Sequence, residues 1–154
     1  MLKIGESSVF EDDWSRRQTS LMYFAGDEDE EPTWSVEIGF SAGDFNGEEI
    51  SPSLCINHIA TDKKTVAELV GESFSVTTVE ESFDREDSFY IYEHEPMIDY
   101  VLTVLEIKED RAHVKCSGTL IVDGYARPCT KAKFEIDSWV PVIESVKDWG
   151  KFGL

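Results

Sequence analysis

The chain has 154 residues and a formal net charge of −18, with 41% hydrophobic and 12% aromatic residues. This length suits a single domain of residues 1–154, and the apolar content is that of a globular protein, which excludes wholesale disorder. The negative charge opposes binding to nucleic acid or to an anionic membrane and favours a basic partner. Residues 1–100 carry 24 acidic and 6 basic side chains, whereas residues 101–154 carry eight of each. We therefore expect the acids of residues 1–100 to gather on one broad side.

No apolar run in the sequence approaches the roughly 18 residues that a membrane-spanning helix needs. The first residues also lack the apolar stretch of a signal peptide, so we expect a cytoplasmic protein. Cys55, Cys116 and Cys129 are an odd number of cysteines without a C-x-x-C pair, which is typical of reduced thiols rather than of a disulfide framework. We expect Cys55 and Cys116 to be small core residues.

Three short strands and one helix are predicted in the first part of the chain. Residues 21–25 favour a strand, and residues 34–40 alternate between apolar and polar side chains, as a half-buried strand does. The consecutive acids of residues 27–31 form the turn between them and repel one another, so they stay solvated. Residues 54–59 favour a third strand, and residues 62–70 predict a short helix that ends at a glycine.

The middle of the chain combines acidic and aromatic residues. Residues 74–79 favour a strand, and the acidic segment 80–87 follows it. Residues 88–92 then form an aromatic strand in which alternate side chains face opposite ways. Phe89 and Ile91 lie on one face of that strand, and Tyr90 and Tyr92 lie on the other. We assign Phe83 and Phe89 to the core.

The last third of the chain predicts an antiparallel meander. Residues 100–107 are apolar on both faces of a two-residue period, as in a strand that is covered on both sides. Residues 112–122 and 130–136 alternate between apolar and polar side chains, and an Asp-Gly turn follows the first of them. Residues 139–143 contain a proline and favour an edge strand. The predicted fold class is mainly β: an antiparallel sheet packed as a sandwich or partly open barrel, with one short helix.

The sequence lacks the motifs that usually carry catalysis. Its histidines, His58, His94 and His113, do not have metal-ligand spacing. The zinc-deaminase signature requires H-x-E and P-C-x-x-C, whereas Glu95 directly follows His94, and no second cysteine follows Cys129 at the required spacing. The sequence has no G-x-S-x-G elbow, Walker motif or Rossmann glycine loop. We expect no metal, no cofactor and no enzymatic activity.

One constellation remains, and it combines carboxylates with tyrosines. Such residues suit the recognition of a Lys- and Arg-rich protein, because they supply packing area, steering and charge-assisted hydrogen bonds. The alternative is that the tyrosines pack under a loop and the acids only keep the protein soluble. The predicted partner-binding residues are Glu80, Glu81, Asp84, Glu86, Asp87, Tyr90, Tyr92, Glu93 and Glu95.

In size, acidity and lack of catalytic motifs, the chain resembles bacterial immunity proteins, which are small cytoplasmic inhibitors of toxins. The resemblance rests on this overall profile and on no residue motif. It implies a non-catalytic inhibitor that binds a basic toxin or nuclease domain through an acidic, tyrosine-containing face. Two other classes remain open. One is an acidic mimic of nucleic acid, and the other is a small-ligand-binding β-barrel with a cavity lined by Trp34, Phe40, Phe74 and Phe134. The sequence does not define the oligomeric state.

Overall fold

The computed structural model describes residues 1–16 and 18–153 of the chain. Strands make up 54% of it and helices 11%, and the main sheet curls into a half-barrel, which confirms the predicted fold class. From the N-terminus, the elements are β1 (Leu2–Ile4), β2 (Ser8–Phe10), β3 (Ser20–Phe24), β4 (Thr33–Gly39), β5 (Gly43–Phe45), β6 (Glu48–Ile50), β7 (Ser53–Ala60), η1 (Val66–Leu69), β8 (Ser73–Val76), α1 (Val79–Asp84), β9 (Ser88–Tyr90), β10 (His94–Glu95), β11 (Met97–Lys108), β12 (Arg111–Asp123), β13 (Thr130–Ile143) and η2 (Val146–Phe152).

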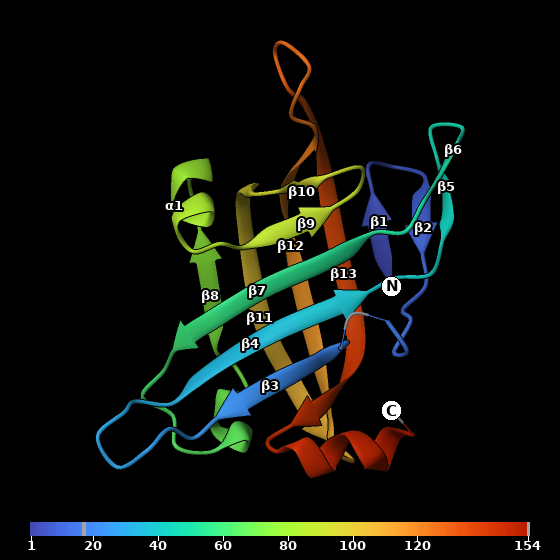
Figure 1. Ribbon diagram of the computed structural model, residues 1–154. Helices are drawn as coiled ribbons and strands as arrows, with labels where there is room; N and C mark the ends of the chain where they lie inside the picture. The colour runs from blue at the N-terminus through green and yellow to red at the C-terminus, as the bar shows by residue number, and fades with distance from the viewer. Residues whose placement is uncertain (17, 154) are drawn as a thin grey trace.

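The half-barrel consists of two walls that share the long strand β13. The strand order is β10-β9-β7-β4-β3-β13-β12-β11-β8, with β1 and β2 attached beside β13. Strands β3, β4, β7 and β9 form a wall that crosses in front of the wall of β8, β11, β12 and β13 in Figure 1. β13 pairs with β12 as far as Pro141 and then pairs in parallel with β3 through Val142 and Ile143, which makes the sheet mixed. Between the walls, the rings of Phe89 and Phe134 lie 5.5 Å apart in the core.

The alternating patterns predict burial correctly in both walls, because successive strand residues face opposite sides of a sheet. The buried side chains include Trp34, Val36, Ile38, Phe40, Leu102, Val104, Val114 and Leu120. Lys131, Lys133 and Glu135 point outward and are exposed, as expected. Cys116 is buried and Cys55 is half-buried, and neither of them forms a disulfide, nor does Cys129.

Two strand predictions need correction. Residues 100–107 are not covered on both faces, since Val101 and Leu105 remain 47% and 39% exposed. β11 belongs to one wall, and the outer face of that wall meets solvent. Residues 139–143 are not an edge strand but the end of β13, which lies between β12 and β3. Pro141 stands where β13 changes its pairing partner, a position that tolerates the missing N–H of a proline.

The α-helix also lies elsewhere than predicted. Within residues 62–70 only the 3-10 turn η1 forms, and the Thr65 side chain at its start accepts no capping hydrogen bond from a backbone N–H. α1 forms instead in the acidic segment, where the Thr78 side chain accepts a hydrogen bond from the backbone N–H of Glu81 at 3.2 Å. Glu80 and Glu81 lie in its first turn, where negative charge complements the helix dipole. None of the helices in the described part of the chain is long and apolar enough to span a membrane.

Gly118→Ala tests the close contact between β11 and β12. A Cβ atom on Gly118 would overlap the carbonyl oxygen of Asp99 and lie 2.7 Å from the Cα atom of Tyr100. Because those are backbone atoms of a paired strand, we expect the substitution to lower the free energy of unfolding by about 3 kcal/mol, as measured by urea denaturation. Gly150→Ala is the control, since its Cβ would enter open space. It should change the free energy of unfolding by less than about 0.5 kcal/mol, and equal effects of the two substitutions would contradict the prediction.

Candidate functional site

Most of the predicted binding residues lie on α1, on the β9–β10 hairpin and on the segment that joins them. In Figure 1 these elements occupy the same end of the molecule as the β12–β13 loop, far from η2 and from the turn between β3 and β4. We call their exposed and half-exposed side chains the acidic–aromatic surface. Its members are Glu80, Glu81, Phe83, Asp84, Glu86, Tyr90, Tyr92, Glu93 and Glu95.

The acidic residues of the first hundred positions do not gather on one side, contrary to expectation. The exposed acids of residues 27–31 lie in the β3–β4 turn at the lower left of Figure 1, whereas α1 lies at the upper left and β6, with the exposed Glu48 and Glu49, at the upper right. The pairing of β3 with β4 places that turn at one end of their wall, whereas the β9–β10 hairpin lies towards the other end. The protein therefore presents at least two separate acidic groups.

Helix α1 turns Phe83 towards solvent and Ser82 towards the core. Ser82 is buried, and its Oγ accepts a hydrogen bond from the backbone N–H of Met97 on β11 at 2.9 Å. The next residue in a helix is rotated by about 100°, so Phe83 faces outward and is 69% exposed. The assignment of Phe83 to the core is therefore wrong. The helical spacing of Val79 and Ser82 is the signal that would have revealed the correct face.

Asp87 is buried and does not belong to the exposed surface. Its Oδ2 accepts hydrogen bonds from the Tyr100 hydroxyl and from Nε of Arg85, the latter at 3.1 Å. The Arg85 guanidinium also donates to the carbonyl oxygen of Asn57 at 2.5 Å and lies over the ring of Phe74, 4.4 Å from its centroid. Burial and the bond to Asp87 raise the pKa of Tyr100. The Asp87 Oδ1 atom, in contrast, has no hydrogen-bond partner.

The tyrosines of the aromatic strand have different surroundings. Tyr90 pairs with His94 across the hairpin, and their rings lie 4.9 Å apart. Tyr92 is 38% exposed, with its ring 6.5 Å from that of Phe45. Burial and the neighbouring Glu48 raise the pKa of Tyr92. The ring of Tyr92 thus packs against Phe45 and still has an accessible face. The ring of Tyr90 is covered more completely, by His94 on the other strand of the hairpin.

Two hollows open on this end of the molecule, and Glu95 lines both. The first, which we call the helix-side hollow, has a volume of about 450 Å³ and is lined by Phe83, Asp84, Glu86, Asp87, Ser88, His94, Glu95 and Pro96. The second, the loop-side hollow, has a volume of about 430 Å³ and is lined by Glu48, Tyr92, Glu93, Glu95, Val122, Asp123, Gly124 and Tyr125. No lysine or arginine is among these lining residues, so both hollows favour positively charged groups.

The loop-side hollow adds three residues that sequence reasoning missed. Glu48 comes from β6, Asp123 from the end of β12, and Tyr125 from the following loop, where it is 77% exposed. The Cα of Gly124 lies against the Glu95 carboxylate, so close that a Cβ there would approach Glu95 Oε1 to 2.5 Å. These segments are distant in the sequence, and no local pattern indicates that the fold brings them together.

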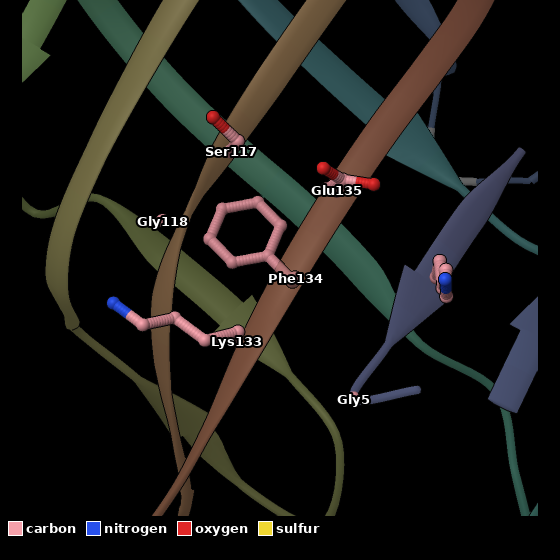
Figure 2. Close-up of a pocket in the computed structure, with 7 residues that line it drawn as sticks. Gly5, Ser117, Gly118, Lys133, Phe134 and Glu135 are labelled. Atoms are coloured by element: carbon pink, nitrogen blue, oxygen red, sulfur yellow. The ribbon is translucent and has the colours of Figure 1, made fainter. Parts of the chain in front are cut away.

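The outer face of the other wall has a different character. Figure 2 shows a hollow beside β12 and β13, with Lys133 and Glu135 on the same strand and Ser117 on the next. Its volume is about 430 Å³, and Lys3 completes its polar lining. The Lys133 ammonium donates to the Thr119 hydroxyl at 2.8 Å. With two lysines and one glutamate, this hollow does not share the uniform negative charge of the acidic–aromatic surface.

The comparisons with known proteins do not assign a family. No family model matches the sequence, and no curated protein or solved structure matches it. Among residues 1–16 and 18–153, no group of three or more His, Cys, Asp or Glu side chains is arranged to hold a metal ion.

Tyr100→Phe tests the buried cluster around Asp87. The substitution removes the hydroxyl donor and leaves a buried carboxylate with Arg85 as its remaining side-chain partner. We expect the free energy of unfolding to fall by about 2–3 kcal/mol, because hydrogen bonds to charged groups are worth more than neutral ones. Tyr125→Phe is the control and should change it by less than about 0.5 kcal/mol, since Tyr125 is exposed. The free energies of unfolding of both variants are measured by chemical denaturation. An unchanged value for Tyr100→Phe would show that the hydrogen bond to Asp87 does not stabilise the fold.

Proposed function

We propose that the protein is a non-catalytic interaction protein that binds a basic protein through the acidic–aromatic surface. The closest functional class is that of the bacterial immunity-type inhibitors, with a basic toxin or nuclease domain as the partner. One observation carries the proposal: two adjacent hollows are lined by carboxylates and aromatic rings, without a lysine or arginine among their lining residues. The same chemistry suits a surface rich in lysine and arginine.

Exposed aromatic rings support binding more strongly than charge does. Phe83, Tyr92 and Tyr125 are 69%, 38% and 77% exposed at this end of the molecule. Large apolar groups held in solvent mark interaction sites when they cluster beside polar residues. Aromatic residues also supply a large share of the binding energy at protein interfaces, while surrounding charges guide the encounter.

The ligand-barrel alternative receives less support. Trp34, Phe40 and Phe134, which would line an internal cavity, are each at most 3% exposed and belong to the packed core. Phe74 packs against that core and against the Arg85 guanidinium. These aromatic rings fill the space between the walls, as in a close-packed interior. The nucleic-acid mimic remains an alternative, in which the partner would be a DNA-binding protein.

Charge reversal tests the proposed docking surface. A partner is first captured from a lysate of the source organism and purified, and its association rate is then measured over a series of salt concentrations. We expect rapid, salt-sensitive association, because surface charges are screened beyond about 8 Å at physiological ionic strength. Replacing Glu80, Glu81, Asp84 and Glu86 by lysine should slow association at least tenfold at low salt.

The matched control reverses four acids of the distant turn, Asp27, Glu28, Asp29 and Glu30. It changes the net charge of the protein by the same amount but leaves α1 and the β9–β10 hairpin intact. Both variants should retain the circular dichroism of the wild-type protein. Reversal of Glu80 and Glu81 should lower the unfolding midpoint, because it places positive charge in the first turn of α1, so the rates are compared at a temperature at which both variants are folded. Two results would contradict the proposal: an equal decrease of the association rate in the two variants, or an association rate that does not depend on salt concentration. Either would mean that the acidic–aromatic surface is exposed to solvent but does not bind the partner.

Tyr92→Ala tests whether an aromatic ring anchors the partner. Because Tyr92 is partly exposed beside the loop-side hollow, its removal should speed dissociation of the captured partner about tenfold or more and leave the association rate nearly unchanged. Phe24→Ala is the control, since Phe24 is 67% exposed on β3, outside both hollows. Surface plasmon resonance separates the two rates. Matching dissociation rates for wild type and Tyr92→Ala would exclude an anchoring role.

A further inference from the structure

Strand β8 forms a free edge of the main sheet. It stands last in the strand order and, within the described part of the chain, pairs only with β11. Figure 1 shows it as the outermost strand of its wall, and the chain continues from it into α1. The backbone N–H and C=O groups on the outer side of an edge strand have no partner in the sheet, so the edge can accept one more strand.

A bulge at the start of β8 shows which of its backbone groups are paired. The backbone N–H of Gly71 donates to the Val104 carbonyl at 2.8 Å, and the N–H of Val104 donates to the Glu72 carbonyl at 3.1 Å. Gly71 has a φ of 89°, the left-handed conformation of the glycine in a G1 bulge. This bulge fixes the phase of the hydrogen bonds along the rest of β8.

The free backbone groups of β8 belong to Ser73 and Ser75. Hydrogen-bonded pairs alternate with non-bonded pairs along an antiparallel ladder. The bonded position at the bulge is followed by the non-bonded pair of Ser73 with Thr103, whose side-chain hydroxyls lie 2.8 Å apart. Phe74 is therefore bonded to β11, and Ser75 is not. The N–H and C=O groups of Ser73 and Ser75 point away from β11, and both residues are exposed.

Other edges of the sheet are protected in ways that β8 is not. Proteins commonly block an edge strand by short length, charged side chains, proline or a covering segment. β10 has two residues, one of them Glu95, and Pro96 follows it. β2 contacts β5, which belongs to the separate β5–β6 hairpin. Residues 73–79, in contrast, contain no charged side chain and no proline. The edge of β8 therefore lacks the side chains that usually prevent strand addition.

Acidic residues at both ends of β8 determine which kind of strand it accepts. Glu72 precedes the strand, and Glu80 and Glu81 lie in the first turn of α1, which follows it. Lysine or arginine at the ends of an added strand would lie near these carboxylates, and opposite charges on neighbouring strands stabilise their pairing. A second copy of this chain would instead bring like charges together, since each copy carries a net charge of −18. A segment of a basic protein therefore fits this edge better than a second copy does.

We propose that the basic partner adds an extended segment to β8, with uncharged residues in its centre and with lysine or arginine near Glu72 and Glu80. Backbone hydrogen bonds to Ser73 and Ser75 hold the segment, and the flanking acids select its charge. An apolar side chain on the inner face of the segment packs against Phe74, which is half-buried. This inference rests on the proposed function and deepens it, because it names the conformation of the partner segment and the strand that receives it.

A synthetic peptide tests the edge on the full chain. The probe is the acetylated and amidated peptide Lys-Val-Thr-Val-Thr-Val-Lys, whose β-branched residues favour an extended conformation. It is titrated into the ¹⁵N-labelled protein, and we expect saturable shifts of the backbone amide signals of Ser73 and Ser75. A control peptide carries N-methyl groups on two neighbouring central amides, which removes a donor from each of its edges. This peptide should bind about fivefold or more weakly, and so should a peptide with glutamate in place of both lysines.

Two substitutions of Ser75 separate the role of its backbone from that of its side chain. Ser75→Pro removes the outward N–H and should weaken binding of the lysine peptide about fivefold. The fold should be retained, because proline is tolerated at edge positions whose N–H faces solvent, and circular dichroism checks this. Ser75→Ala is the matched control, since it removes the hydroxyl but keeps the N–H, and it should leave the affinity unchanged. If Ser75→Pro does not fold, the methylated peptide makes the same comparison on the wild-type protein.

Four results would overturn strand addition by a basic segment. They are equal binding of the lysine and methylated peptides, an unchanged affinity in folded Ser75→Pro, shifts confined to residues outside β8, and a dimer of the chain alone that Ser75→Pro dissociates. The last result would assign the edge to a second copy. Failure of the peptide experiments would leave the proposed function intact if the charge reversal on α1 slows association with the captured partner. Peptide binding at β8 without an effect of that reversal on the partner would instead contradict the acidic–aromatic surface as the docking site.

Discussion

The arrangement of this molecule depends on one buried carboxylate. Asp87 binds Tyr100 on β11, in one wall, and Arg85, which reaches the carbonyl of Asn57 on β7, in the other wall. A single side chain therefore ties both walls to the segment that follows α1. Removing one partner of a buried charged pair usually costs about 3–5 kcal/mol, because the remaining charge stays in a poorly solvated place. The end of the half-barrel that carries the acidic–aromatic surface is held in place by this cluster.

The same cluster explains how so short a helix can hold the side chains of the proposed binding surface in place. α1 has six residues, too few for a helix to be stable in isolation. Its Thr78 cap satisfies one backbone N–H, its buried Ser82 hydroxyl accepts from the backbone of β11, and the Arg85–Asp87 pair follows directly after it. These bonds fix the orientation of Phe83 and Asp84. Preorganised side chains lose less entropy on binding, so a small rigid element can serve as well as a longer one.

Local periodicity determined what the sequence could predict. The strands of residues 34–40 and 112–122 follow from alternation, because one face of each is buried over its whole length. The acidic segment 80–87 has no such signal: its buried residues are a serine and an aspartate, and its phenylalanine is exposed. Hydrophobicity therefore assigns Ser82, Phe83 and Asp87 to the wrong environment, although it places the acids of the helix correctly in solvent. Its position is set by hydrogen bonds to β7 and β11, contacts between distant segments that a sequence pattern does not encode.

Charge alone does not distinguish the two acidic ends of the protein. The turn of residues 27–31 carries five consecutive exposed acids, a denser run than any on α1. At long range, both groups attract a basic protein, and salt screens both. Residence time, however, comes from groups that exclude water once the partners touch. Phe83, Tyr92 and Tyr125 are exposed at the end that also holds the two acidic hollows. The acidic–aromatic surface is therefore the proposed docking site, because it combines attraction with three exposed aromatic rings and two hollows, whereas the more highly charged turn has the single exposed ring of Phe24 beside it and lines neither hollow.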